Sequence, residues 1–176
     1  DTSVILKWLI EDAGYEVVAF CADLGQGEDF SSVREKANAV GACSVYIEDL
    51  RDVFVEDFVF PMLRANAVYE GAYPLATALG RPLIAKLLVD KARAVGASAV
   101  AHGCTGKGND QVRFDIALRA LAPDLEIVGT ARETEWTREE ALAYCARHGI
   151  SVQSKGASPF SIDENLWGRA IEAGVL

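Results

Sequence analysis

A glycine-rich loop between residues 98 and 111 is the stretch of this sequence best suited to binding chemistry. A small apolar segment leads into it, and it holds three glycines, one lysine and an Asn-Asp pair: Gly103, Gly106, Gly108, Lys107 and Asn109-Asp110. Glycines let backbone N–H groups approach a ligand, and we expect the Asn-Asp pair to cap a helix whose N-terminus adds a partial positive charge. Lys107 adds a full charge. The loop therefore predicts a site for an anionic ligand.

Two common nucleotide-binding motifs are excluded by their spacing. A P-loop has Lys and then Ser or Thr directly after its last glycine, whereas Gly108 is followed by Asn109. A dinucleotide-binding fingerprint has a third glycine at the position of Gln111. Without further context, the loop is equally compatible with a flexible connection between a strand and a helix.

The composition limits the class of protein. The 176 residues suit one domain, and a hydrophobic content of 51% is enough for a substantial core. The net charge of −9 argues against a broad nucleic-acid surface, and no apolar run approaches the ~20 residues of a membrane span. We therefore expect a soluble, cytoplasmic protein with no nucleic-acid or membrane partner. Four dispersed cysteines without a Cys-x-x-Cys pair favour neither a zinc site nor a disulfide framework, so no metal site is predicted.

Strands and helices alternate along the chain. We expect strands at 15–23, 43–48, from 98, 125–128 and 150–152, and helices that include 4–11, 31–40 and 49–68. This alternation predicts an α/β protein with a parallel sheet. Ligands of such sheets lie beyond the carboxyl ends of the strands, which here carry Ala22-Asp23 and the glycine loop.

Local signals mark several boundaries. We expect Ser31-Ser32 to cap a helix, Pro61 to kink or break one, and Thr137 with Glu140 to form a capping box. His102 is expected at a strand end as a hydrogen-bonding residue. The segment after about residue 154 is less regular.

Matching stretches along the whole chain point to a known family. They are Asp1-Thr-Ser3, Ala22-Asp-Leu-Gly-Gln26, Arg64-Ala-Asn66, Tyr69-Glu-Gly-Ala-Tyr-Pro-Leu75, Arg81-Pro82, His102 to Phe114, Leu121-Ala-Pro123 and Ser158-Pro-Phe-Ser-Ile-Asp163. On these residues the sequence resembles the N-terminal nucleotide-binding half of argininosuccinate synthase, a member of the N-type ATP pyrophosphatase, or PP-loop, superfamily. The run Thr-Gly-Lys-Gly-Asn-Asp-Gln-Val-Arg at 105–113 is highly specific to this family.

The resemblance implies a fold, a reaction and an assembly. The fold is a three-layer, Rossmann-like α/β domain of the adenine nucleotide alpha hydrolase type over residues 1–176, lacking its central first strand. In the reaction, the ureido oxygen of citrulline attacks the α-phosphate of Mg-ATP to give citrullyl-AMP and pyrophosphate. The amine of aspartate then displaces AMP to form argininosuccinate, a step of arginine biosynthesis and the urea cycle. The full-length enzyme is implied to be a homotetramer.

The resemblance also implies roles for individual residues. Those that would bind ATP are Asp1, Thr2, Ser3, Ala22, Ala101, His102, Gly103, Cys104, Thr105, Gly106, Lys107, Gly108 and Asn109. Those that would bind aspartate are Thr105, Asn109 and Asp110, and those that would bind citrulline are Tyr73, Thr77, Asn109, Arg113 and Ser161. Arg113 follows Asn109 by four residues, so both face one way from a first helical turn, where a guanidinium can bind a carboxylate. No side chain is an evident nucleophile or general base, so catalysis would rest on alignment and charge stabilisation.

The sequence departs from the family pattern at three places. The Ser-Gly-Gly-Leu that precedes Asp1-Thr-Ser3 in the family is absent, and so is the C-terminal synthetase half toward which residues after about 154 lead. Ala170 stands where some members place a serine that contacts citrulline. We therefore expect a fragment that is inactive by itself. Two other hypotheses remain: another PP-loop ATP pyrophosphatase, and a non-catalytic nucleotide-binding module resembling the universal stress proteins.

Overall fold

The computed structural model describes residues 2–104, 108–130, 134, 136–150 and 161–172. The described helices are α1 Thr2–Glu11, α2 Phe30–Val40, α3 Arg51–Phe54, the π-helical turn η1 Val55–Val59, α4 Phe60–Arg64, α5 Ala76–Val95, α6 Asn109–Leu121 and α8 Arg138–Arg147. The described strands are β1 Val18–Asp23, β2 Ser44–Asp49, β3 Ala99–Ala101, β4 Glu126–Val128, β5 Ser161–Asn165 and β6 Gly168–Glu172. None of these helices is long and apolar enough to cross a membrane.

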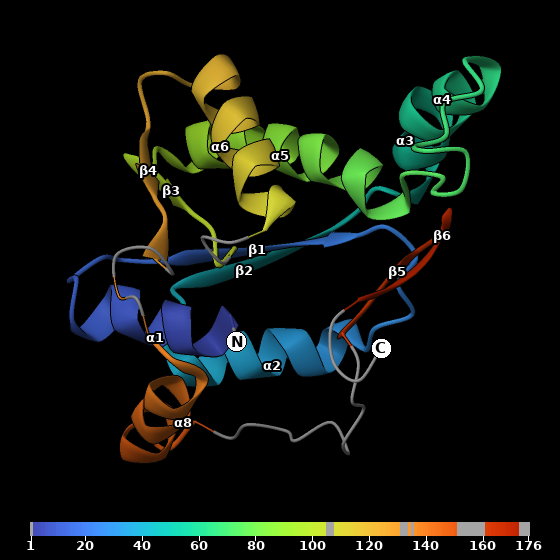
Figure 1. Cartoon of the computed structure of the whole chain (residues 1–176). Coiled ribbons are helices and arrows are strands. Elements are labelled where there is room, and N and C mark those ends of the chain that lie inside the picture. The colour runs from blue at the N-terminus through green and yellow to red at the C-terminus, as the bar shows by residue number, and fades with distance from the viewer. Residues whose placement is uncertain (1, 105–107, 131–133, 135, 151–160, 173–176) are drawn as a thin grey trace.

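The helices lie in layers on both sides of strands β1 and β2, with α5 and α6 on one side and α1 and α2 on the other (Figure 1). β1 pairs with β2 in parallel, with Val18 opposite Ser44, and β3 pairs with β4 in parallel, with Ala99 opposite Glu126. The predicted α/β class with parallel strands is confirmed. Among the described residues, these strands form two separate pairs instead of one continuous sheet. Alternation of strands and helices predicts the direction of neighbouring strands but does not predict which strands are neighbours.

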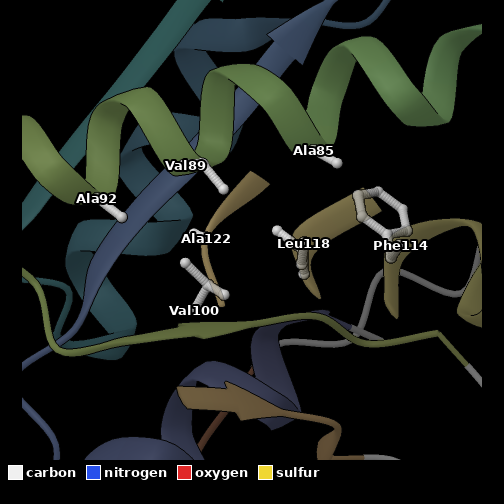
Figure 2. Close-up of a cluster of buried hydrophobic side chains, with 7 residues drawn as sticks. All are labelled: Ala85, Val89, Ala92, Val100, Phe114, Leu118 and Ala122. Atoms are coloured by element: carbon white, nitrogen blue, oxygen red, sulfur yellow. The ribbon is translucent and has the colours of Figure 1, made fainter. Parts of the chain in front are cut away.

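A cluster of buried apolar side chains joins α5, α6 and β3 (Figure 2). Its members are Ala85, Val89, Ala92, Val100, Phe114, Leu118 and Ala122. The small side chains of α5 let α6 approach closely, and Phe114 and Leu118 fill the space between the two helices. Leu121, at the end of α6, is 41% exposed. This packing fixes α6 against α5 and β3.

The helix predicted at 49–68 forms as α3, η1 and α4 and ends at Arg64. In η1 the N–H of Phe60 donates to the carbonyl of Val55, five residues back, and Pro61 follows directly. Proline cannot donate a helical hydrogen bond, and its ring crowds the preceding turn, so the chain widens there and continues as a helix. Phe54 of α3 is buried.

Other helix and strand boundaries can be compared with the prediction. Asp29, and not Ser31-Ser32, caps α2, because its carboxylate accepts the N–H of Ser31. The capping box of Thr137 and Glu140 at α8 is confirmed. Of the strand predicted at 150–152, Ile150 lies outside any described strand, and the other two positions are outside the described residues.

The less regular tail contains an antiparallel hairpin, which the sequence analysis does not predict. Ile162 of β5 pairs with Ile171 of β6, and Asn165 pairs with Gly168. Figure 1 shows the hairpin beside the segment that follows β1 and near the start of α5. It therefore belongs to the same end of the molecule as several predicted site residues.

Candidate functional site

The end of β1 carries Ala22, the predicted adenosine contact. The side chain of Gln26 closes the loop that follows: it donates to the carbonyl of Ala22 at 2.8 Å and accepts the N–H of Leu24 at 2.8 Å. Leu24 is buried, and a Cβ added to Gly80 of α5 would lie 2.8 Å from its Cδ1. The side chain of Leu24 would have to move to admit a larger residue at position 80, because the loop after β1 lies directly against α5.

The glycine loop begins where β3 ends, at Ala101. A Cβ added to Gly103 would lie 2.4 Å from Cδ1 of Ile5, so the loop passes close to this side chain of α1, which would have to move to admit a larger residue. Thr2 and Ser3 are the first residues of α1, about one turn from Ile5. The structure thus brings α1 and the loop together, as the proposed ATP roles of Thr2, Ser3 and Gly103 require.

His102 forms a buried pair with Asp115 of α6. Its Nε2 lies 2.8 Å from Oδ1 of Asp115, and its ring stacks on Phe114. The backbone N–H of His102 donates to the carbonyl of Val128. An ionised carboxylate can only accept, so this contact is a hydrogen bond in the His102 tautomer that carries its proton on Nε2. His102 is the hydrogen-bonding residue at a strand end that its position predicts.

Cys104 is half-buried and packs against the apolar cluster of α5, α6 and β3. Burial raises the pKa of its thiol, and the negative charges of Asp110 and Asp115 raise the pKa further, against a smaller opposing effect of Arg81. The thiol is therefore neutral at neutral pH. This supports the expectation that Cys104 is not a nucleophile.

α6 begins at Asn109, and its N-cap is Gly108, which makes no side-chain cap hydrogen bond. The prediction that Asn109-Asp110 caps this helix is wrong, since both residues lie inside its first turn. The carboxylate of Asp110 is directed to two arginines instead. No side chain of the N-cap residue therefore competes with an anion for the first-turn N–H groups.

Asp110 is held between two guanidinium groups. Oδ2 accepts from Arg81 of α5 at 2.9 Å from Nε and 2.8 Å from Nη2, and Oδ1 accepts from Nη1 of Arg113 at 2.8 Å. Nη2 of Arg81 also lies 4.0 Å from Oδ1 of Asp163 in β5. The side chain of Asp110 is 27% exposed, so the cluster is accessible to a ligand.

Tyr73 and Thr77 lie at the start of α5, and Thr77 stands one turn before Arg81. The phenol oxygen of Tyr73 accepts the N–H of Thr77 at 3.0 Å. Because Arg81 contacts Asp110, α5 brings the two predicted citrulline residues to the side of α6 that carries Asp110 and Arg113.

Ser161 is the first residue of β5 and lies two positions before Asp163. Ala170 pairs with Asp163 across the hairpin, so the two side chains share one face. The positions of Ser161 and Ala170 thus belong to a hairpin that reaches Arg81.

The remaining predicted residues cannot be placed. Asp1, Thr105, Gly106 and Lys107 lie outside the described residues. In the part of the chain that the structure describes, no three His, Cys, Asp or Glu side chains are grouped so that they could hold a metal ion.

The sequence analysis missed three charged residues of this region. Asp115 pairs with His102, while Arg81 and Asp163 lie around Asp110. Arg81 and Asp163 fall within matching stretches, but no spacing rule links them to Asp110, because the contacts join three different elements.

Residues 1–151 match the family described as the arginosuccinate synthase N-terminal HUP domain. The chain belongs to this argininosuccinate synthase family. The argininosuccinate synthases of Geobacillus thermodenitrificans and Listeria monocytogenes serotype 4a are 54% and 56% identical to it over 176 residues. These alignments cover 100% of this chain, and the chain spans 43% of the length of each relative.

The family match confirms the resemblance to argininosuccinate synthase. A HUP domain has an adenine nucleotide alpha hydrolase-like fold, which agrees with the α/β layers and the parallel strand pairs. The match favours this family over other PP-loop ATP pyrophosphatases and over the universal stress proteins.

Proposed function

We propose that this chain is the nucleotide-binding part of an argininosuccinate synthase, a ligase that uses ATP to join citrulline to aspartate. The family match and the names of relatives 54% and 56% identical to the chain support this function. The structural observation that carries it is the meeting of Arg81, Asp110 and Arg113 at the first turn of α6, which follows the glycine loop. Such a site offers charged groups for amino acids next to a loop suited to phosphates.

The residues around the glycine loop fit a nucleoside triphosphate. The first-turn N–H groups of α6 can bind phosphate oxygens, and Thr2 and Ser3 bring hydroxyl donors on α1, which touches Gly103. The ATP contacts in this proposal are Asp1, Thr2, Ser3, Ala22, Ala101, His102, Gly103, Cys104, Thr105, Gly106, Lys107, Gly108 and Asn109. Magnesium would come with the nucleotide as Mg-ATP. Bound ATP would supply an electrophilic α-phosphate, and the ureido oxygen of citrulline would leave as part of AMP.

The Asp110 cluster fits two amino acids. Asp110 can accept a hydrogen bond from the ammonium group of the substrate aspartate. Asn109 and Thr105, close to Asp110 in the sequence, are proposed as further aspartate contacts. Arg113 can bind the carboxylate of citrulline, and Tyr73, Thr77 and Ser161 are proposed as its further contacts. Oδ1 of Asp110 accepts from Arg113 alone and has a lone pair left for an ammonium group, whereas Oδ2 already contacts both Nε and Nη2 of Arg81.

The neutral thiol of Cys104 supplies no nucleophile, so this chain acts by alignment and by fixed charges. The proposed step needs the ureido oxygen of citrulline in line with the α-phosphate. Thr77 of α5 and Arg113 of α6 are proposed to bind citrulline, and the first-turn N–H groups of α6 are proposed to bind phosphate. In this proposal both ligands would meet at that end of α6.

The test is an assay of the complete gene product with ATP, citrulline and aspartate. The proposal predicts equal amounts of argininosuccinate, AMP and pyrophosphate, and no argininosuccinate when any one substrate is omitted. Formation of AMP without citrulline, or a requirement for a different acceptor, would contradict it. The homotetramer remains a prediction, which light scattering of the complete protein would test.

A further inference from the structure

The tip of the β5–β6 hairpin binds two separate segments of the molecule. Three hydrogen bonds make this contact: Leu166 N–H to the Leu24 carbonyl at 2.8 Å, Asn165 Nδ2 to the Ala76 carbonyl at 2.8 Å, and Trp167 Nε1 to the Pro74 carbonyl at 2.7 Å. The first bond reaches the loop after β1, and the other two reach the start of α5. One hairpin tip therefore joins the predicted adenosine side to the predicted citrulline side.

The segment before α5 has a strained backbone. Asn66, Glu70 and Leu75 have positive φ angles of 49°, 52° and 59°, a region that residues with side chains rarely adopt. Leu75 is the N-cap of α5 and makes no side-chain cap hydrogen bond. Strain of this kind persists only where the surroundings hold the chain in place.

The hairpin holds Leu75 from both sides. Trp167 binds the carbonyl of Pro74, the residue before Leu75, and Asn165 binds the carbonyl of Ala76, the residue after it. The indole ring of Trp167 also packs against the buried cluster around Leu24. These contacts supply the support that the strained residue requires.

The segment held in this way carries Tyr73 and Thr77. Both are proposed to contact citrulline, and the phenol oxygen of Tyr73 accepts the N–H of Thr77 across Leu75. A shift of the Leu75 backbone would therefore move both side chains at once. Misplacement of a substrate contact by about 1 Å can cost as much as 10²-fold in rate.

Asn165 also shapes the hairpin tip. Its Oδ1 accepts the N–H of Trp167 at 2.9 Å and the N–H of Gly168 at 3.3 Å, while its Nδ2 makes the bond to Ala76. The two ends of one amide thus have separate tasks. The oxygen closes the tip, and the nitrogen binds α5.

We propose that Asn165 and Trp167 are positioning residues, which fix the Tyr73–Thr77 segment in the conformation that binds citrulline. The inference rests on the proposed function of this site. In this inference, Asn165 and Trp167 do not contact citrulline. They affect its binding by holding the backbone on either side of Leu75. The side-chain N–H groups of Asn165 and Trp167 bind only the start of α5, whereas the loop after β1 is held by the backbone N–H of Leu166, so nucleotide binding is expected to change less.

Two variants of the complete protein separate this role from folding. Trp167→Phe keeps an aromatic ring and removes the indole N–H, and Asn165→Asp keeps an oxygen that closes the tip and removes the donor to Ala76. Each is expected to raise the KM for citrulline about tenfold and to leave the KM for ATP within about twofold. Trp8→Phe is the matched control, because Trp8 packs against a different cluster, which includes Tyr144. It is expected to leave both KM values within about twofold.

Hydrogen exchange of the wild-type protein gives a second test that needs no variant. If the bound hairpin favours citrulline binding, citrulline must in turn favour the bound hairpin. Citrulline with ATP is therefore expected to slow exchange of the Leu166 N–H, which donates to the carbonyl of Leu24. Unchanged citrulline KM values in both variants, or unchanged exchange on adding citrulline, would overturn the inference and leave the proposed function standing. A wild-type protein without citrulline-dependent activity would overturn both.

Discussion

Two aspartates of α6 pair with basic residues and differ in exposure. Asp115 lies with His102, and their side chains are 13% and 5% exposed. Asp110 lies with Arg81 and Arg113 at the N-terminal end of the helix, where its side chain is 27% exposed. One helix therefore carries one carboxylate enclosed by protein and another that a ligand can reach.

The difference separates support from binding. The buried pair fixes His102, the residue before Gly103, to α6. If either residue left its partner to bind a ligand, a buried polar group would lose its hydrogen bond. The contacts of Asp110 with Arg81 and Arg113 contribute less to stability, because water screens these partly exposed charges. The three side chains can therefore rearrange around a charged ligand. We expect changes at Asp115 to act on stability and changes at Asp110 to act on substrate binding.

Asp110→Asn tests the binding side with the largest expected effect. Loss of the negative charge removes the partner of a substrate ammonium group and leaves two guanidinium groups facing each other. In the complete protein, kcat/KM for aspartate is expected to fall roughly a hundredfold, or about 2.7 kcal/mol, with little change in Tm. Asp124→Asn is the control, because Asp124 forms an exposed pair with Arg93. An equal loss of activity in both variants would contradict the account.

Asp115→Ala tests the supporting side. The substitution leaves Nε2 of His102 buried without its acceptor, which is expected to lower the free energy of unfolding by about 2 kcal/mol. Thermal or urea denaturation measures this. Asp90→Ala, which breaks an exposed pair with Lys86, should change stability by less than about 0.5 kcal/mol. A stable Asp115→Ala protein would show that the buried pair does not support the fold.

Arg81→Gln tests how far the binding role of Asp110 depends on a neighbouring helix, because Arg81 contacts Asp110 from α5. Loss of its contacts lets the carboxylate turn, so the KM for aspartate is expected to rise about fivefold, with a smaller rise for Arg81→Lys. Combined with Asp110→Asn, it should add little further loss, since it acts through that residue. Additive losses in the double variant would show that Arg81 acts independently.

Ala170→Ser is expected to have the smallest effect. Ala170 pairs with Asp163 on the hairpin face that reaches Arg81, and a hydroxyl there offers one more hydrogen bond to citrulline. The KM for citrulline should fall by about two- to threefold. Ala170→Val adds volume without a hydroxyl and should bring no such gain. A lower KM in the valine variant would assign the effect to packing.

Much of the fold could be predicted because its signals are local. The capping box of Thr137 and Glu140 and the parallel strand pairs follow from spacing and alternation. The hairpin could not, because two-residue turns are usually recognised by Asn and Gly, whereas its tip carries Leu166 and Trp167. These two residues are stabilised by contacts with Leu24 and with the start of α5.

The site divides in the same way. The placement of Asn109, Asp110 and Arg113 on one helical turn follows from their spacing. The contact of Arg81 with Asp110 spans 29 residues and depends on how α5 packs on α6, which no sequence pattern specifies. The predicted cap by Asn109-Asp110 is wrong because the helix already begins at Asn109, and the carboxylate of Asp110 binds two arginines.

The most direct test of the account follows the ureido oxygen of citrulline through the reaction. Citrulline labelled with ¹⁸O at this atom is supplied to the complete protein with ATP and aspartate, and the products are examined by mass spectrometry. If this chain aligns the oxygen with the α-phosphate, the label appears in AMP and is absent from pyrophosphate and argininosuccinate. Label in pyrophosphate, or unlabelled AMP alongside argininosuccinate, would contradict the central claim.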